Sequence, residues 1–185
     1  MERRIVARWQ DWSGKRVEHT VVTCAEESNS ADGVIIGASD GHHFAVRYQI
    51  RCDGSWTLKH ACVQIVGEQR KVEFASDGRG KWTDASGNPL PALDGAIDID
   101  LSVSPFTNTL PIRRLQLTKE GWAEIRAVYV DFPDLTIVSD PQRYTCVEPL
   151  RRYRYESLDS DFVREIEVDK DGLVATYPGL FKRLL

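Results

Sequence analysis

The sequence predicts a mainly β protein, a single domain of residues 1–185 in which a curved antiparallel sheet forms an incomplete barrel or roll. Apolar and polar residues alternate with a period of two along most of the chain, as in strands that bury one face. Asp-Gly pairs, which readily adopt the positive φ of tight hairpin turns, separate the alternating segments. Helical periodicity is scarce, so at most one or two short helices are expected.

Five segments in the first part of the chain are rich in β-branched and aromatic residues, and each is expected to form a strand. These segments are Arg4–Gln10, Arg16–Cys24, Gly33–Ala38, Phe44–Cys52 and Ser55–Val66. Turns are expected between strands at Asp32-Gly33, Asp40-Gly41 and Asp53-Gly54. The last of these turns joins the final two segments and is the clearest hairpin signal in the chain.

The second part of the chain continues in the same way. Pro111 is expected to open a strand, and a turn at Lys119–Gly121 leads into the next one. Val72–Gly78 and Ile166–Gly172 share one order of apolar, acidic and turn residues. This repeat would allow two similar β layers, although any two hairpins could share it. The further strands are expected at Trp122–Pro133, Leu135–Val138, Arg143–Val147, Arg151–Glu156, Val163–Val168 and Leu173–Tyr177.

Composition and charge exclude several classes of protein. The net charge is −4 with both signs interspersed, so the basic excess of a nucleic-acid-binding surface is missing. The first residues lack the apolar run of a secretory signal, and no segment has the length of a membrane span. A cytoplasmic location is therefore expected. In that compartment the widely spaced Cys24, Cys52, Cys62 and Cys146 are expected to be free thiols.

The stretch Ile97–Val103 places two acids on one strand face. Asp98 and Asp100 alternate with aliphatic residues, so their carboxylates would lie roughly 6–7 Å apart along the strand. That spacing overlaps the range of glycosidase carboxylate pairs, whereas two carboxylates are too few ligands for a divalent cation. Acids that face solvent or pair with the next turn are the alternative interpretation.

The loop after this strand favours a structured polar corner over a catalytic dyad. A Ser-Pro pair ends the strand because proline has no N–H for the ladder. If the flanking strands pair, Arg113 and Arg114 come near the two acids, with Asn108 in the loop between them. Arg–carboxylate forks would then form, or a polar head group would take the place of one carboxylate.

No motif specifies a catalytic residue, a metal or a cofactor. His42 and His43 are sequence neighbours, so they point to opposite faces of a strand and cannot hold one ion together. The chain has no P-loop, no dinucleotide-binding fingerprint and no nucleophile elbow. We therefore expect no cofactor and no metal, and we assign no catalytic residue.

Several motifs together carry a family resemblance. The blocks "DGAIDIDLSVSPFTNTLPIRRL", "EGWAEIRAVYVDFPDLTI" and "DGLVATYPGLFKRL", with "YRY" at Tyr153–Tyr155, span most of the chain. The pattern resembles a bacterial family of glycolipid-binding proteins. That resemblance implies a mostly β protein that binds a glycolipid or a similar amphiphile, with no defined catalytic residues.

The residues themselves are compatible with this function. Tyr153 and Tyr155 share a strand face and could stack on a sugar at the polar mouth of an apolar pocket. The predicted ligand-binding residues are Asp98, Asp100, Asn108, Arg113, Arg114, Tyr153 and Tyr155. Two alternatives stay open. One is a hydrolase acting on glycosides or glycolipids through Asp98 and Asp100, and the other is a protein-interaction module. The oligomeric state is not predicted.

Overall fold

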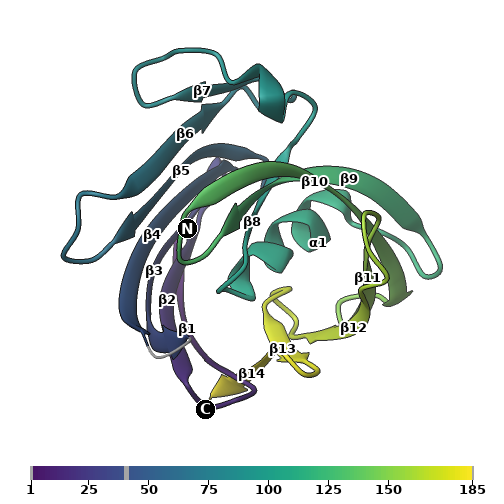
Figure 1. The fold of residues 1–185 in the computed structure, drawn as a ribbon. Helices are drawn as coiled ribbons and strands as arrows, with labels where there is room; N and C mark the ends of the chain where they lie inside the picture. The colour runs from purple at the N-terminus through teal and green to yellow at the C-terminus, as the bar shows by residue number, and fades with distance from the viewer. Residues whose placement is uncertain (1, 40–41, 185) are drawn as a thin grey trace.

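The computed structural model describes residues 2–39 and 42–184, which form one 14-stranded sheet curled around a short helix (Figure 1). The first seven strands are β1 (Arg3–Asp11), β2 (Arg16–Cys24), β3 (Ser28–Ser39), β4 (His42–Asp53), β5 (Leu58–Ile65), β6 (Lys71–Ser76) and β7 (Trp82–Asp84). The second seven are β8 (Asp98–Leu101), β9 (Trp122–Asp131), β10 (Thr136–Glu148), β11 (Arg152–Ser157), β12 (Val163–Val168), β13 (Val174–Tyr177) and β14 (Phe181–Leu184). The helical elements are η1 (Pro91–Leu93), η2 (Phe106–Asn108) and α1 (Thr109–Leu115).

The strands are arranged as two meanders that meet at the first and last strands. The order across the sheet is β7-β6-β5-β4-β3-β2-β1-β14-β13-β12-β11-β10-β9-β8. Arg8 pairs with Leu184 and Asp11 with Phe181, so β1 and β14 form the seam between the two halves. All of these neighbours are antiparallel except β8 and β9, which run parallel. The sheet is open, with β7 and β8 as its edges, so the predicted curved sheet is confirmed but does not close into a barrel.

The five strands expected in the first half are confirmed as β1 to β5, but two of the expected turns differ. Asp32-Gly33 is not a turn, because Gly33 lies in the middle of β3. A Cβ at Gly33 would lie 2.2 Å from the Tyr48 ring, so close packing explains this glycine better than turn geometry does. The Asp53-Gly54 hairpin is confirmed, although the positive φ of its loop falls on Trp56. Asp40-Gly41 lies outside the described residues.

In the second half, β9, β11, β12 and β13 are confirmed, whereas the gap expected between the strands Leu135–Val138 and Arg143–Val147 is wrong. Residues 136–148 form one continuous strand, β10. The Pro141 carbonyl accepts a hydrogen bond of 2.9 Å from the N–H of Leu158, so its nitrogen faces the same side, away from β9. The missing N–H therefore does not interrupt the β9–β10 ladder.

The strand expected after Pro111 is also wrong, because this segment is the helix α1. Pro111 lies in the first helical turn, where the backbone N–H groups have no helical partner, so proline is tolerated there. Gln116 adopts a left-handed conformation with φ of 46° and ends the helix. None of the helices in the described part of the chain is long and apolar enough to cross a membrane.

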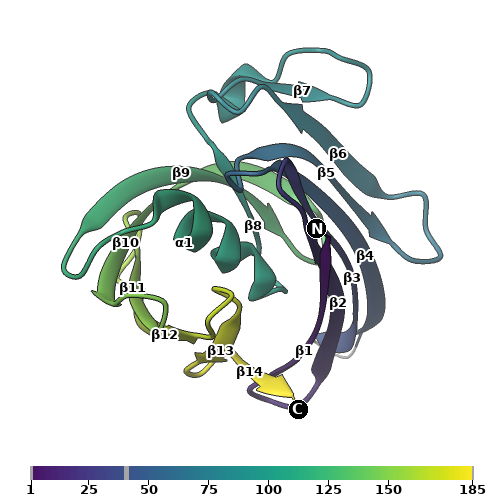
Figure 2. The same cartoon turned by 180° about the vertical axis from the view of Figure 1, so that it is seen from behind.

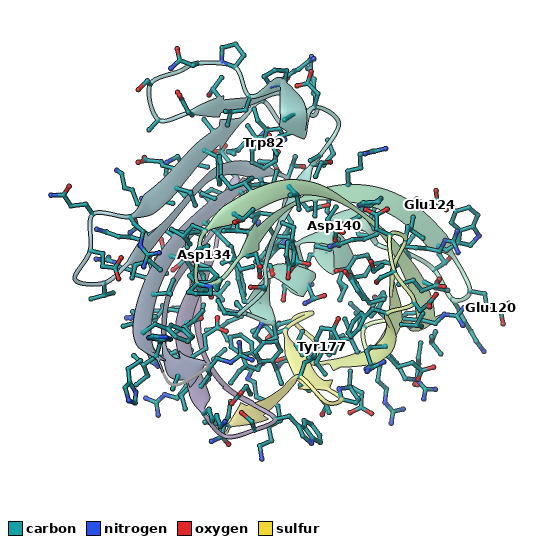
Figure 3. All side chains as sticks on the ribbon, in the orientation of Figure 1. Trp82, Glu120, Glu124, Asp134, Asp140 and Tyr177 are labelled. Atoms are coloured by element: carbon teal, nitrogen blue, oxygen red, sulfur yellow. The ribbon has the colours of Figure 1, made fainter. Side chains whose placement is uncertain are left out.

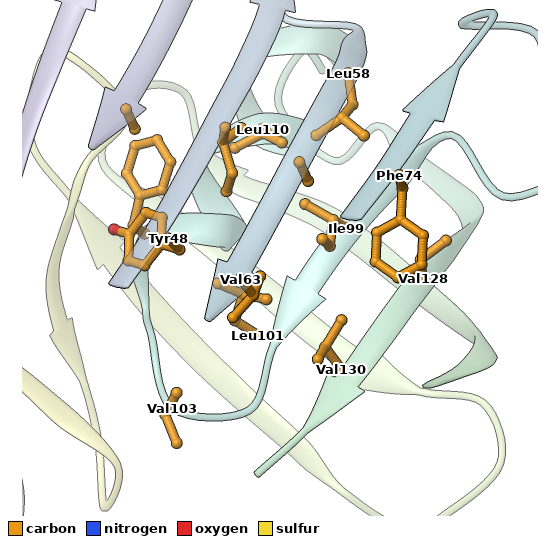
Figure 4. Packing of buried hydrophobic residues seen from close by; sticks show 14 of the residues in the cluster. Tyr48, Leu58, Val63, Phe74, Ile99, Leu101, Val103, Leu110, Val128 and Val130 are labelled. Carbon is orange, nitrogen blue, oxygen red and sulfur yellow. The ribbon is translucent and has the colours of Figure 1, made fainter. Parts of the chain in front are cut away.

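Two hydrophobic clusters hold the curved sheet around α1. The first lies between the inner faces of β1–β6 and the β8–β9 pair and includes Tyr48, Val63, Phe74, Ile99 and Val128 (Figure 4). The second is formed by β10–β14 and α1. Leu110 belongs to the first cluster and Ile112 to the second, so the helix fills the space that the sheet encloses (Figure 2). The β6–β7 hairpin extends beyond this rolled part.

Candidate functional site

The site is built around β8 and the helical segment that folds back against it. Asp98 is fully buried, and its two carboxylate oxygens accept hydrogen bonds from Arg114 on α1, at 3.1 Å from Nε and 2.5 Å from Nη2. Burial raises the pKa of Asp98, while the hydrogen bonds and charge of Arg114 oppose that rise. This fork attaches α1 to β8 and leaves Asp98 engaged within the protein.

Asp100 lies two residues further along β8 and has neutral partners. Its Oδ1 accepts a hydrogen bond from the Thr107 hydroxyl at 3.1 Å, and its Oδ2 accepts one from the Gln142 amide at 2.9 Å. The same Gln142 nitrogen donates to Asp140 at 2.7 Å. One neutral amide therefore joins two carboxylates, one from β8 and one from β10.

These two carboxylates line a cavity of about 320 Å³ inside the curved sheet, which we call the inner cavity. Asp140 on β10 and Tyr177 on β13 lie on either side of this interior (Figure 3). One part of the wall is acidic and hydroxylic, and the other is aromatic. The lining comprises Asp100, Leu101, Ser102, Ser104, Asn108, Tyr129, Asp140, Tyr155, Ser157, Ser160, Phe162, Tyr177, Leu180 and Phe181.

The aromatic part of the wall is a packed group of rings. Tyr155 meets Phe162 edge-on at a centroid distance of 5.9 Å and Tyr177 at 6.4 Å. Tyr144 packs against Tyr155 from the core side at 5.5 Å, and its hydroxyl donates to the Asn108 amide oxygen at 2.9 Å. The rings are thus held in place by one another and by hydrogen bonds.

Burial makes the acids of the inner cavity weaker. It raises the pKa of Asp100 to about 6, and the charges of Asp140 and Asp98 add to that rise. Burial also raises the pKa of Asp140. The pKa of Tyr129 rises to about 12, mainly through burial and partly through Asp131 and Asp100. The cavity therefore disfavours its own negative charge.

A third acid, Glu18 on β2, is connected to the cavity wall through Ser104. The Glu18 Oε1 atom is within 2.8 Å of the hydroxyls of Ser104 and Thr20 and 2.5 Å from that of Tyr48. Its Oε2 atom is buried and has no hydrogen-bond partner among the described residues. Desolvation raises the pKa of Glu18 to about 7, and the three hydroxyl groups only partly oppose this rise.

The structure brings three of the seven predicted ligand-binding residues together. Asp100, Asn108 and Tyr155 line the inner cavity. Asp98 and Arg114 instead pair with each other. Tyr153 shares the buried face of β11 with Tyr155, but its hydroxyl accepts a hydrogen bond from the Leu150 N–H at 3.2 Å and it lines a different cavity. Arg113 also lines that other cavity, with its guanidinium 5.7 Å from the Trp56 ring centroid.

The sequence analysis missed Asp140 and Gln142 because they lie between two predicted strands, Leu135–Val138 and Arg143–Val147, which are one strand in the structure. In the continuous strand β10, side chains alternate between faces, so Asp140, Gln142 and Tyr144 fall on the same face. Reading the alternation through the proline would have placed these residues together. Within residues 2–39 and 42–184, no three His, Cys, Asp or Glu side chains cluster so as to hold a metal ion.

Comparison with known proteins places this arrangement in a family. A family model described as "Putative glycolipid-binding" matches residues 6–183. The crystal structure of a DUF1089 family protein from Pseudomonas aeruginosa is similar, with 39% sequence identity and a TM-score of 0.79. That similarity covers 90% of this chain and 92% of the other. No curated protein matches the sequence.

Proposed function

Because this chain belongs to the glycolipid-binding family, we propose that it is a non-enzymatic protein that binds the head group of an amphiphile, a glycolipid, in the inner cavity. The observation that carries the proposal is the composition of the cavity wall. Asp100, Asn108 and the serines offer hydrogen-bonding groups for sugar hydroxyls, and Tyr155 and Tyr177 offer ring faces for the C–H surface of a sugar.

The volume of the inner cavity limits which part of the ligand it holds. At about 320 Å³ it lies at the low end of the range of roughly 300–1,000 Å³ for small-molecule sites. A head group of about one sugar ring suits this volume, whereas the acyl chains of a lipid require space outside it. In this proposal the apolar side chains of Leu180 and Phe181, which also line the cavity, contact the first part of the tail.

The two alternative functions have less support. A hydrolase that uses Asp98 and Asp100 needs both carboxylates in one cleft, but Asp98 is buried against Arg114 and does not line the inner cavity. An interaction module would need an apolar surface patch and no ligand cavity. A cavity with mixed polar and aromatic walls favours a small-molecule ligand instead.

Native mass spectrometry of protein purified from its own host tests the proposal. We expect a bound mass that is released on denaturation and identified as a glycolipid. Ser157→Phe, which puts a ring into the inner cavity, is expected to abolish that bound mass. Ser55→Phe makes the same change on an exposed turn and should retain it. Wild-type protein that is empty and also ignores a panel of glycolipids would contradict the proposal.

A further inference from the structure

Building on the proposed function, we infer that the head group bound in the inner cavity carries a positive charge, as the protonated amine of an amino sugar does. Charge balance in the cavity wall is the first argument. Asp100 and Asp140 line the cavity, and none of its lining residues within the described chain is Lys, Arg or His. An anionic head group would meet two carboxylates and no cation, while a cationic one would meet complementary charge.

Three other buried or half-buried acids of this protein have an arginine partner, whereas Asp100, Asp140 and the more distant Glu18 have none among the described residues. Asp98 pairs with Arg114, Asp11 with Arg16 at 3.3 Å, and Asp169 with Arg183 at 3.1 Å.

Asp100 and Asp140 instead share one neutral donor, the Gln142 amide. Both amide hydrogens of Gln142 are used in these two contacts, so the pair has hydrogen bonds but no charge compensation. A buried charge without a counter-ion is costly, and a ligand cation would remove that cost.

The aromatic wall supplies the second argument. Tyr155, Phe162 and Tyr177 form a cluster with centroid distances of 5.9 to 6.5 Å on one side of the cavity. Ring faces attract ammonium groups, and rings combined with carboxylates are a common way to bind them. The cluster already receives one cation, because the Arg164 guanidinium lies 4.7 Å from the Phe162 centroid.

Proton release on binding follows from the groups around the acid pair. Asp100 faces Asp98 of the Arg114 fork, Tyr144, Tyr155 and Tyr177, while Asp140 is also near Asp159. Among the described residues, two cations lie near this group: Arg114, whose charge is engaged by Asp98, and the exposed Arg164, which lies over the Phe162 ring and acts on Tyr177. The other neighbours are acidic or neutral. A ligand cation would therefore lower the pKa of Asp100 from about 6, so the amine should bind more tightly at pH 7, where it is still largely protonated, than at pH 5.

Three octyl glycosides that differ in head-group charge provide the test. At about pH 6.5, octyl glucosaminide is cationic, octyl glucoside is neutral and octyl glucuronide is anionic. Calorimetric titration at this pH, below their micelle concentrations, compares their affinities. We expect the amine to bind at least about tenfold more tightly than the neutral glycoside and the glucuronide to bind most weakly. Equal or tighter binding of the neutral or anionic glycoside would overturn the inference.

Variants that remove one carboxylate charge test whether Asp100 and Asp140 cause the preference for the amine. Asp140→Asn and Asp100→Asn keep the shape of the side chain, and each is expected to reduce the amine-to-neutral affinity ratio about tenfold. Asp134→Asn is the matched control, because Asp134 is exposed in the turn between β9 and β10. Thermal unfolding would confirm that all three variants fold. An unchanged ratio in both folded cavity variants would overturn the inference.

The free sugars separate this inference from the proposed function. If D-glucosamine binds and D-glucose does not, while no octyl glycoside binds, the cationic site stands and the lipid part of the proposed function fails. If the neutral octyl glucoside binds as well as the amine, amphiphile binding stands and the charge preference fails.

Discussion

At the level of single residues, three hydroxyl groups and no cation surround the carboxyl of Glu18. The Tyr48, Thr20 and Ser104 hydroxyls all approach Oε1, while Oε2 is buried without a partner among the described residues. This arrangement ties three parts of the chain together, namely β2, β4 and the loop before η2. It also depends on Gly33, since a side chain there would displace the Tyr48 ring that donates to Glu18.

Glu18 is expected to make the stability of the protein depend on pH. The pKa of glutamate is about 4.3 in the unfolded chain, whereas burial raises the pKa of Glu18 to about 7 in the folded protein. Between these values the folded state binds the proton and the unfolded state does not, so stability falls as pH rises through this window. Glu18→Gln cannot ionise and should be more stable than the wild type at pH 8, by up to about 3 kcal/mol.

Urea denaturation of both proteins at pH 5 and pH 8 measures this effect. The stability gain of Glu18→Gln should be clearly larger at pH 8 than at pH 5. Glu27→Gln, at an exposed position, serves as the control and should show no such difference. A gain that is the same at both pH values would mean that the Glu18 carboxyl does not titrate in this range.

At the level of elements, α1 is attached to β8 by one buried ion pair. Arg114→Met would leave Asp98 buried without a cation and is expected to lower the free energy of unfolding by about 3–5 kcal/mol. Arg113→Met, one residue earlier on the same helix, removes a guanidinium over the Trp56 ring that has no ion pair among the described residues, and it should cost less. Denaturant titration followed by circular dichroism compares the two variants.

A double variant tests whether the unpaired charge of Asp98 causes the loss of stability in Arg114→Met. Asp98→Asn combined with Arg114→Met removes both charges, so it should be less destabilised than Arg114→Met alone. If the double variant is destabilised by the sum of the single effects, the two side chains act independently and the ion pair does not explain the attachment.

The alternation of residues was enough to predict most of the strands, but the segments around Pro111 and Pro141 were predicted wrongly. Proline is tolerated both in the first turn of a helix and at the start of a strand, so Pro111 alone does not distinguish the two. Packing inside the curved sheet selects the helix. Pro141 lies between two predicted strands that are continuous in the structure, and its hydrogen-bond partner Leu158 is not visible in the sequence. That error also hid Asp140, half of the acid pair in the cavity.

The predicted polar corner contains the expected Arg–carboxylate fork, but the elements that form it differ from the prediction. An Arg–carboxylate fork forms between Arg114 and Asp98, but the partner strand that should have brought them together is a helix. Asp100, Asn108 and Tyr155 do meet at one cavity. Which of two neighbouring arginines turns inward depends on the rotation of α1 about its axis, and the sequence alone does not determine that rotation.

At the level of the whole molecule, the two halves of the sheet differ in what they contact: the second half lines the inner cavity, and the first half packs against β8 and β9. The residues that line the inner cavity all lie between Asp100 and Phe181, in the second half of the chain. The first half packs its inner face against β8 and β9 and reaches the cavity wall through the contact between Glu18 and Ser104. Changes in β1–β5 are therefore expected to affect stability more than ligand selectivity.

Because β1 pairs with β14, the order of the strands across the sheet is a circular shift of their order along the chain. Read from the β8 edge, the strands follow the order β8 to β14 and then β1 to β7, which is the chain order started at a different point. A circular permutant opened at the exposed Gly87, with a flexible linker from residue 184 to residue 3, would make every neighbouring pair of strands sequential.

Such a permutant is expected to keep the same fold and to refold faster than the natural order, because its most distant pairing becomes a local one. Stopped-flow refolding of both chains would measure this, and slower refolding of the permutant would show that the seam does not limit the rate. Each strand of the permutant could then add to the growing sheet next to the strand that precedes it in the chain, with no long-range closure left to the end.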